Sequence, residues 1–594
     1  MTSTASIDQR DDGRTASIAA LAVAVGVVSG FAAALLIALI RLITHVAFEG
    51  RVSLAPADPS QHHLGALVIV IPIAGAVLVS LMARWGSEAI RGHGIPEVMD
   101  RILHADSRIP AKLTVLKPLS AAVAIGTGGP FGSEGPIIAT GGALGSLLGQ
   151  VIHVTADERK ILLAAGAAAG MAATFGTPVA AVLLAIELLL FEFRARSIVP
   201  VALAACAATA VRLILLGDDL IYPMPTVAEP SGVALACYAL LGIAIGAVSV
   251  GITKSLYAVE DLFERLPVHW MWWPLLGAVV VGVAGYLDPR ILGVGPENII
   301  NSLAARLTIA GTATLLVLKF VAWVAYLGSG TSGGTLAPLF TFGSGLGAIF
   351  GMTAAALFPE LGIAPPVAAL VGMAAMFAGA SRALLASVVF AFEATRQPLG
   401  LLPLLAGCTT AYLTSRALMK HSIMTEKLAR RGVLIQDDYA VDFLARIPVD
   451  RAMTRMVATL SADTLVAVAR AIPVHGDGAG HQGFPVLDGE GRLVGVVTMR
   501  DLHRPDAPAT VGELIRRPPL VAYPDQSLRD AADIMVREAV GRLPVVTRTT
   551  PRELVGILSR SDLLRAHAPR LQAAEQRRQL VRLDRWSRIV FRRR

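Results

Sequence analysis

The stretch GTGGPFGSEGPIIATGGALGSLLG, residues 126–149, returns 202 positions later as GSGTSGGTLAPLFTFGSGLGAIFG, residues 328–351. A second pair, GMAATF at 170–175 and GMAAMF at 372–377, has the same offset. Because small residues are frequent wherever membrane helices pack closely, single matches carry little weight. Two blocks at one offset indicate an internal duplication. The ungapped first block is identical at Gly126, Gly128, Gly132, Pro136, Gly141, Leu144, Gly145 and Gly149.

Each copy has a glycine-rich turn followed by a proline and an apolar run. We expect helices to begin near Gly135 and Ala337, since Pro136 and Pro338 then fall in a first turn, where a missing N–H is harmless. A helix that begins inside a membrane presents free N–H groups and its positive dipole end to an anion. The segment GHGIP at 92–96 predicts a third such start. Three converging starts would hold a monovalent anion and still release it, whereas the alternative is that these glycines only permit close packing.

Composition divides the 594-residue chain into a membrane part and a soluble part. It is 54% hydrophobic and 16% charged, whereas a soluble domain carries about 25% charged residues. Long apolar runs continue to residue 418, and charges become frequent after Lys420. Runs this long predict membrane spans. The candidate spans are 16–40, 64–82, 161–190, 198–216, 233–253, 270–287, 309–325, 339–357, 367–378 and 401–418.

Glycine and proline interrupt several of these spans. Interrupted backbone is tolerated in a membrane only where it is packed in protein or lines a watery cavity, so the interruptions indicate a transport pathway. We expect residues 1–15 to form a polar segment and not a cleaved signal peptide. Isolated in apolar runs, Cys206, Cys237 and Cys408 are predicted to be small buried hydrophobic residues, with neither metal-ligand spacing nor a disulfide framework.

The net charge of +8 is concentrated at the end of the chain, where arginines crowd residues 577–594. Under the positive-inside rule this tail predicts a multi-pass protein of the cell membrane with a cytoplasmic C-terminus, in contact with anionic lipid. Nucleic-acid binding is disfavoured, because no recognition motif accompanies the arginines.

Glu134 is an acid between apolar flanks, directly before a predicted helix start. Intramembrane acids are costly and usually functional. When ionised, its carboxylate would compete with a transported anion, and when protonated it would leave. The alternative is a simple N-cap acid. After a four-residue slip of the repeat, Glu187 aligns with Glu393; both could be structural acids near a water interface, the interpretation favoured for Glu393.

In this order, the three loops resemble those of the CLC family of chloride channels and proton-coupled chloride exchangers. That family places GSGIP-like, GREGP-like and GxFxP-like loops at helix starts, and here they read GHGIP (92–96), GSEGP (132–136) and GTLAP (334–338). The resemblance covers residues 16–432. It implies an all-α polytopic membrane domain built as an inverted repeat, a homodimer with one pore per subunit, and transport of chloride or a similar anion. No enzymatic activity and no required cofactor are implied, and Glu134 falls on the gating glutamate.

The resemblance also implies an anion site and shows where this chain departs from it. The usual serine is His93 here, and a usual tyrosine is Met424. The imidazole could donate a hydrogen bond, or add charge below about pH 6.5; alternatively the ring packs aside. With both hydroxyls replaced, nitrate, bromide and fluoride stay open beside chloride. The implied anion-binding residues are His93, Gly94, Ile95, Gly135, Thr335, Leu336 and Met424.

Exchangers of this family usually carry an inner glutamate that relays protons. The corresponding position is Leu188, and Glu187 stands just before it. A proton path through Glu187 and Leu188 is thereby weakened, although water could bridge the gap to Glu134. Both a voltage- or pH-gated channel and a proton antiporter remain open, and retention of Glu134 favours the antiporter.

After Arg431 the pattern becomes mixed α/β, and two segments resemble cystathionine-β-synthase-type (CBS) repeats. Strands are predicted at 484–487 and 493–498, and again at 543–546 and 554–559, with helices at 464–471 and 527–537. The resemblance implies a cytoplasmic α/β pair that can bind an adenine nucleotide; alternatively its acids only cap helices. The implied nucleotide-binding residues are Thr498, Asp501, Ser559 and Asp562.

The resulting division of the chain has six parts. They are a polar segment (1–15), the transmembrane domain (16–432), a linker (433–448), two CBS repeats (449–506 and 507–568) and a basic tail (569–594). Two other classes of protein are disfavoured. A divalent cation channel would need more acids along the pore, and a membrane enzyme would need a nucleophile–base pair or a metal cluster.

Overall fold

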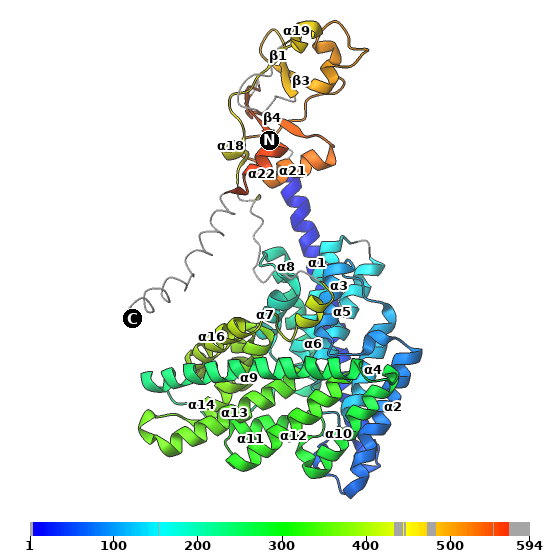
Figure 1. Cartoon of the computed structure of the whole chain (residues 1–594), viewed down its shortest axis with the longest axis vertical. Helices are drawn as coiled ribbons and strands as arrows, with labels where there is room; N and C mark the ends of the chain where they lie inside the picture. The colour runs from blue at the N-terminus through cyan, green and yellow to red at the C-terminus, as the bar shows by residue number, and fades with distance from the viewer. Residues whose placement is uncertain are drawn as a thin grey trace, which may run out of the picture. The chain divides into compact units, whose positions relative to one another are not determined.

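The computed structural model describes residues 4–152, 154–432, 444, 447–471, 483–549 and 552–568. Most of the predicted linker and the whole basic tail, 569–594, lie outside these ranges. The chain divides into two compact units, Met1–Tyr439 and Ala440–Arg594, which are described separately (Figure 1). The first is helical and the second combines strands with short helices, so the predicted fold class is confirmed.

The helices of the first unit come in the same order twice. A long helix is followed by a shorter one, a short amphipathic one and five more. The first set is α1 (Thr4–Thr44), α2 (Val70–Trp85), α3 (Ile95–His104), α4 (Ala111–Gly126), α5 (Glu134–Val151), α6 (Ala156–Phe175), α7 (Pro178–Ala185) and α8 (Ala195–Leu216). The second is α9 (Gly232–Glu264), α10 (Trp273–Leu287), α11 (Pro296–Leu303), α12 (Ile309–Gly328), α13 (Leu336–Leu357), α14 (Pro365–Ser381), α15 (Leu384–Thr395) and α16 (Leu401–Leu418), after which comes α17 (Glu426–Arg430).

Within the described residues, seven helical segments are long and apolar enough to cross a membrane. The first includes most of α1, which begins at Thr4, so the expected polar segment continues the first helix instead of preceding it. The seven segments are Arg14–Glu49, Gly65–Trp85, Ala195–Leu216, Gly232–Glu264, Trp270–Leu287, Ile309–Gly328 and Leu336–Leu357.

Two predictions about individual segments of the first unit are wrong. The single span expected at 161–190 is two helices, because Gly176 takes a left-handed conformation (φ 64°) that ends α6, and Pro178 begins α7. Cys206 is exposed on α8, while Cys237 is partly buried and Cys408 is buried. Apolar residues also cover the outer faces of helices that cross a membrane, so an apolar run does not place a cysteine in the interior.

Two pairs of close helices relate the halves. The helices of each pair are labelled in Figure 1. The α5–α6 contact brings Gly141 against Gly166, and the α13–α14 contact brings Gly343 against Gly372. A Cβ on Gly141 would lie 2.1 Å from the Gly166 oxygen, and one on Gly343 would lie 2.3 Å from the Gly372 oxygen. Gly343 lies 202 positions after Gly141, whereas Gly372 lies 206 positions after Gly166.

The four-residue slip therefore lies between the two helices of each pair. The sequence match of GMAATF (170–175) with GMAAMF (372–377) was wrong as a structural alignment, because Gly372 corresponds to Gly166. Four residues are about one helical turn, and small residues recur at nearly every turn of α6 and α14. Similar runs thus match one turn out of register.

The second unit contains two similar hairpins, each followed by a short helix. A parallel β1–β2 pair and an antiparallel β2–β3 pair form a three-stranded sheet, and an antiparallel β4–β5 pair forms a second sheet. The strands are β1 (Leu460–Ser461), β2 (Gly483–Leu487), β3 (Leu493–Thr498), β4 (Arg542–Val546) and β5 (Leu554–Ser559). The helices are α18 (Val449–Ala452), α19 (Val466–Arg470), α20 (Met499–Leu502), α21 (Leu528–Arg537) and α22 (Arg560–Arg565).

The glycine contacts predict where a single methyl group is not tolerated. Gly166→Ala places its Cβ 2.0 Å from the Gly141 oxygen, and we expect the free energy of unfolding to fall by about 1–3 kcal/mol, as for other overpacked sites. The matched control is Gly251→Ala in α9, where a Cβ meets no atom within 4 Å. Thermal unfolding of the purified full-length variants in detergent measures both, and equal unfolding temperatures for the two variants would contradict the packing argument.

Candidate functional site

The three predicted loops meet in the interior of the first unit. Gly92 N–H donates to the Thr331 oxygen at 2.9 Å, and Gly334 N–H donates to the Gly132 oxygen at 3.0 Å. These bonds belong to two isolated bridges, Gly92 with Ser332 and Gly132 with Gly334. The starts of α3, α5 and α13 are thereby brought together, although they are far apart in the sequence.

Backbone touches backbone where these loops meet. A Cβ on Gly135 would lie 2.0 Å from the His93 oxygen, and one on Gly94 would lie 2.6 Å from the Gly135 oxygen. Gly94 also has a φ of 93°, which glycine adopts far more readily than other residues. Glycine is therefore required at both positions. In this arrangement Ile95 is the first residue of α3, Thr335 the N-cap of α13 and Leu336 its first residue.

Glu134 lies where these helix starts converge. It is the first residue of α5 and only 1% exposed. Its carboxylate interacts with the backbone N–H groups of Ala337, in the first turn of α13, and of Glu134 itself. Oε2 lies 2.9 Å from the position of a Cβ on Gly334 and has no hydrogen-bond partner. The carboxylate thus occupies a place that favours an anion, and it reaches beyond its own helix.

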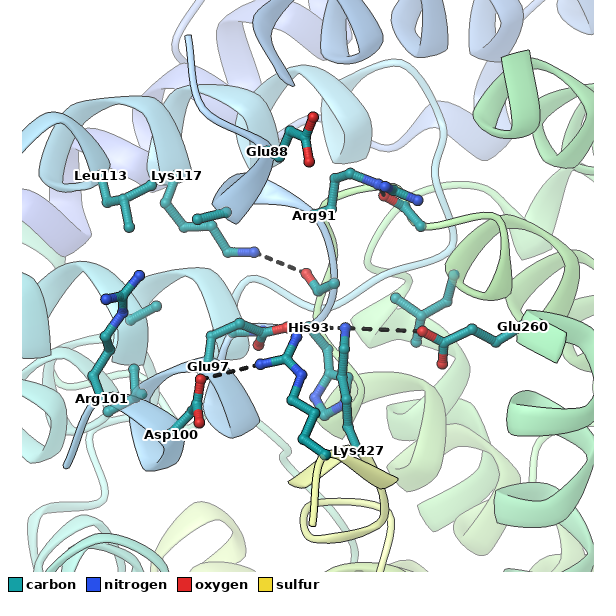
Figure 2. Close-up of a pocket in the computed structure, with 18 of the residues that line it drawn as sticks. Glu88, Arg91, His93, Glu97, Asp100, Arg101, Leu113, Lys117, Glu260 and Lys427 are labelled. Carbon is teal, nitrogen blue, oxygen red and sulfur yellow. Dashed lines mark hydrogen bonds and ion pairs between the residues drawn. The ribbon is translucent and has the colours of Figure 1, made fainter. Parts of the chain in front are cut away.

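His93 lines a cavity of about 520 Å³ beside this convergence (Figure 2). The residue is 5% exposed, and neither ring nitrogen has a hydrogen-bond partner. Its backbone contacts Gly135, as described above, while its side chain faces the cavity. His93 therefore belongs both to the convergence of loops and to the cavity.

Met424 is fully buried and packs in the apolar core of the first unit. Its N–H donates to Ser422 Oγ at 3.3 Å. The preceding residue, Ile423, accepts a hydrogen bond of 2.8 Å from the hydroxyl of Tyr257 in α9. Sequence reasoning missed Tyr257, which supplies a hydroxyl next to Met424 from another helix. No local motif around residue 257 could have found it.

Glu187 is held by a helix of the other half. Its two oxygens accept hydrogen bonds of 3.0 Å from the N–H groups of Leu385 and Ala386, at the start of α15. The neighbouring Leu188 is buried and apolar. Both carboxylate oxygens of Glu187 are therefore committed to a helix cap, and the position expected for a proton-relaying acid carries none.

Glu393 makes the reciprocal contact. It accepts hydrogen bonds from Val179 N–H at 3.1 Å and Ala180 N–H at 2.8 Å, at the start of α7. Each acid thus caps a helix of the half to which it does not belong. Such an exchange of identical contacts is what a two-fold relation between two similar units produces.

A pair of buried lysines was also missed. The ammonium group of Lys117, in α4, donates to the oxygens of Ile90 (2.7 Å) and Gly92 (2.8 Å) and so holds the loop before α3. Lys319, in α12, makes a longer contact of 3.4 Å to the Ile291 oxygen before α11. The two lysines are separated by the repeat offset of 202 and stand in apolar helices, so the sequence carried the signal.

The predicted nucleotide-binding residues of the second unit form two capping boxes. Thr498 N–H donates to Asp501 Oδ2 at 3.0 Å, and Asp501 N–H donates to Thr498 Oγ1 at 3.3 Å. Ser559 and Asp562 repeat the pattern at 2.8 and 3.3 Å. The pairs begin α20 and α22, directly after β3 and β5. Within the described ranges, no group of three or more His, Cys, Asp or Glu residues could hold a metal ion.

Two family models match the chain. The model described as voltage gated chloride channel matches residues 74–416, and the CBS domain model matches residues 449–505 and 511–568. Among similar proteins, a putative chloride channel protein ClcB-like from Ralstonia nicotianae is 28% identical over 366 residues, covering 61% of this chain and 85% of the relative. The H(+)/Cl(-) exchange transporter ClcA of Vibrio parahaemolyticus is 30% identical over 375 residues, covering 61% and 79%.

Solved structures have the same fold. A slow cyanobacterial Cl−/H+ antiporter has a TM-score of 0.63 at 24% identity and covers 70% of this chain and 97% of its own. A eukaryotic CLC transporter has a TM-score of 0.58 at 21% identity and covers 92% of this chain and 97% of its own. A CLC-type fluoride/proton antiporter also has a TM-score of 0.58, at 23% identity, covering 69% and 97%.

The contact between loops predicts that Gly135 is essential for anion binding. Gly135→Ala would separate the α3 and α5 starts, since its Cβ lies 2.0 Å from the His93 oxygen, and we expect chloride affinity to fall about tenfold or more, a loss of at least ~1.4 kcal/mol. Gly142→Ala in the same helix is the matched control, because its Cβ would make ordinary contacts of 3.5 Å or more. Isothermal titration with chloride compares the variants, and unchanged affinity in Gly135→Ala would contradict the prediction.

Proposed function

The chain belongs to the voltage gated chloride channel family, and on this premise we propose that it exchanges chloride for protons across the cell membrane, with Glu134 as the gate. As a member of that family it is a membrane-spanning anion transporter and not an enzyme. The observation that carries the proposal is the Glu134 carboxylate in front of the α5 and α13 starts, buried and with one oxygen unpaired.

The gate works by competition between two anions for one place. An ionised Glu134 carboxylate occupies the space in front of the helix starts and excludes chloride. Protonation removes the negative charge of the carboxylate and with it the electrostatic attraction to the positive helix ends. The side chain then leaves and chloride enters. Because the helix ends carry only partial charges, the anion is held weakly enough to move on. Each opening consumes a proton, which couples the two movements.

We propose chloride as the transported anion, because the similar protein from Vibrio parahaemolyticus is named an H(+)/Cl(-) exchange transporter. Fluoride is the second candidate, since one structural neighbour is a fluoride/proton antiporter. The changes at His93 and Met424 supply the reason to test it, because neither side chain offers the usual hydroxyl. Competition by fluoride, nitrate and bromide in the chloride assay ranks the anions.

We further propose a homodimer with one pore per subunit and a cytoplasmic second unit, as the family resemblance implies. The CBS pair would bind an adenine nucleotide at Thr498, Asp501, Ser559 and Asp562 and regulate transport. Two equivalent Ser/Thr–Asp pairs after equivalent strands support a shared ligand site.

Glu134→Gln tests the gate. A carboxamide resembles the protonated acid but cannot release a proton, so we expect chloride efflux from proteoliposomes to persist and coupled proton movement to disappear. Wild-type protein should drive protons uphill from a chloride gradient, recorded as internal pH in the same vesicles. Glu360→Gln, at an exposed acid, is the control. Full coupling in Glu134→Gln would refute the gate, and chloride flux without protons in the wild type would make the protein a passive channel.

Asp562→Asn tests the nucleotide site. We expect affinity of the full-length protein for ATP, ADP or AMP to fall about tenfold, because a carboxylate hydrogen bond to a ribose contributes roughly 1.5–3 kcal/mol. Asp530→Asn is the matched control, since Asp530 caps α21 with Ser527 but lies outside the two motifs. Isothermal titration that shows equal losses in both variants, or no nucleotide binding at all, would overturn this assignment.

A further inference from the structure

We propose that the His93 imidazole takes protons from the cavity that it lines and passes them through water to the Glu134 carboxylate. This inference deepens the proposed exchange and rests on it. It assigns a proton-relay role to the loop before α3, in a chain where Glu187, the acid just after α7, has both carboxylate oxygens engaged in hydrogen bonds.

His93 connects two compartments. Its backbone oxygen lies against Gly135, next to the start of α5 and therefore next to Glu134. Its side chain lines the cavity of about 520 Å³ (Figure 2). A proton that enters the cavity thus meets the ring before it reaches the anion site.

The ring is unengaged. His93 is only 5% exposed, and both ring nitrogens are without hydrogen-bond partners. Leaving buried polar atoms unpaired is costly, and a neutral imidazole offers one donor and one acceptor. Both nitrogens are buried and without protein partners, so a water molecule that enters beside the ring from the cavity would find a donor and an acceptor there.

The charged groups that face His93 are Glu97, Lys117 and Lys427, and each of them is held. Glu97 accepts a 2.8 Å hydrogen bond from Gly94 N–H and one of 3.3 Å from Lys427. Lys427 also lies 3.9 Å from Glu260. Lys117 donates to two loop carbonyls. Figure 2 shows these side chains around the ring. Among these groups, His93 alone has no fixed partner.

The wall of the cavity excludes neither ion. Its basic side chains are equal in number to its acidic ones, so the wall carries no net formal charge. Beyond the groups that face His93, the other charged side chains of the wall are Glu88, Arg91, Asp100, Arg101, Glu264 and Arg431, with Glu260 as already named. Protons and chloride can therefore share this cavity, as exchange requires.

The proposed step moves one proton and changes no oxidation state. A hydronium ion in the cavity gives its proton to the unprotonated ring nitrogen, which leaves water and an imidazolium. The imidazolium N–H bond then breaks as the proton passes through water to Glu134, where a carboxyl O–H bond forms. The ring returns to its neutral form.

The test uses full-length protein in proteoliposomes, with chloride efflux and internal pH recorded together. His93→Gln keeps a hydrogen-bonding side chain but cannot titrate, so we expect the number of protons moved per chloride to fall about 100-fold, whatever the change in chloride flux, as for loss of a general acid–base group. His45→Gln is the matched control, since His45 is also buried but contacts Glu49 and Ala55, outside the cavity wall. It should keep its coupling.

His93→Ala supplies a second readout. Added imidazole should restore coupled proton movement, whereas pyrazole, which has the same shape but is hardly protonated near neutral pH, should not. Equal restoration by both compounds would mean that the ring only fills space and would overturn the relay.

The remaining outcomes separate the two proposals. A wild-type protein that moves chloride without protons overturns the exchange and, with it, the relay. Coupled wild type with equally coupled His93→Gln overturns the relay alone. Loss of both fluxes in His93→Gln, with no rescue of His93→Ala by imidazole, makes His93 an anion ligand or a packing residue and also overturns the relay.

Discussion

The first N–H groups of a helix need partners, and inside a membrane water cannot supply them. This constraint shapes the first unit, where three helices begin in the interior. The structure turns these starts toward one another across Gly94 and Gly135, whose missing side chains let the backbones touch. What remains in front of α5 and α13 is a place for negative charge, filled by Glu134. The glycines, which let the helix starts approach, and the acid, which lies in front of them, therefore both serve to satisfy the free N–H groups.

Three acids lie at helix starts, and their hydrogen bonds distinguish them. Glu187 and Glu393 each use both oxygens on two N–H groups of the opposite half. To release either acid, two backbone groups would have to lose their partners. Glu134 has one unpaired oxygen, so fewer hydrogen bonds would have to break for its side chain to leave, as the proposed gate requires. Under the proposed gating, a permanent cap and a movable gate would be built from the same residue type, and the number of carboxylate oxygens that accept hydrogen bonds would distinguish them.

The sequence predicted the helix starts to within one residue: near Gly135 and Ala337, against Glu134 and Leu336 in the structure. A turn that contains glycine and proline is determined by a few neighbouring residues, so the helix start that follows it can be predicted from a short stretch of sequence. Two predictions were wrong: the alignment of the GMAATF block and the single span at 161–190. Packing between helices, and not local composition, decides the register of the repeat and the place where a helix breaks. The reciprocal caps were also beyond local reasoning, since each joins residues about 200 positions apart. Lys117 and Lys319 could have been found, because they share the repeat offset.

Positions 188 and 93 differ in what holds a titratable side chain in place. An acid at position 188 would lie in the π-helical turn Ile186–Leu190 that follows α7, next to Glu187 and its cap on α15. A titratable ring at position 93 instead sits on a loop that Lys117 fastens through two carbonyls and Glu97 fastens through Gly94 N–H. The backbone of that loop is fixed while the ring itself is left without partners. In the proposed relay, such rigid support around a side chain without partners would hold the ring at a fixed distance from Glu134, which repeated proton transfer along one path demands.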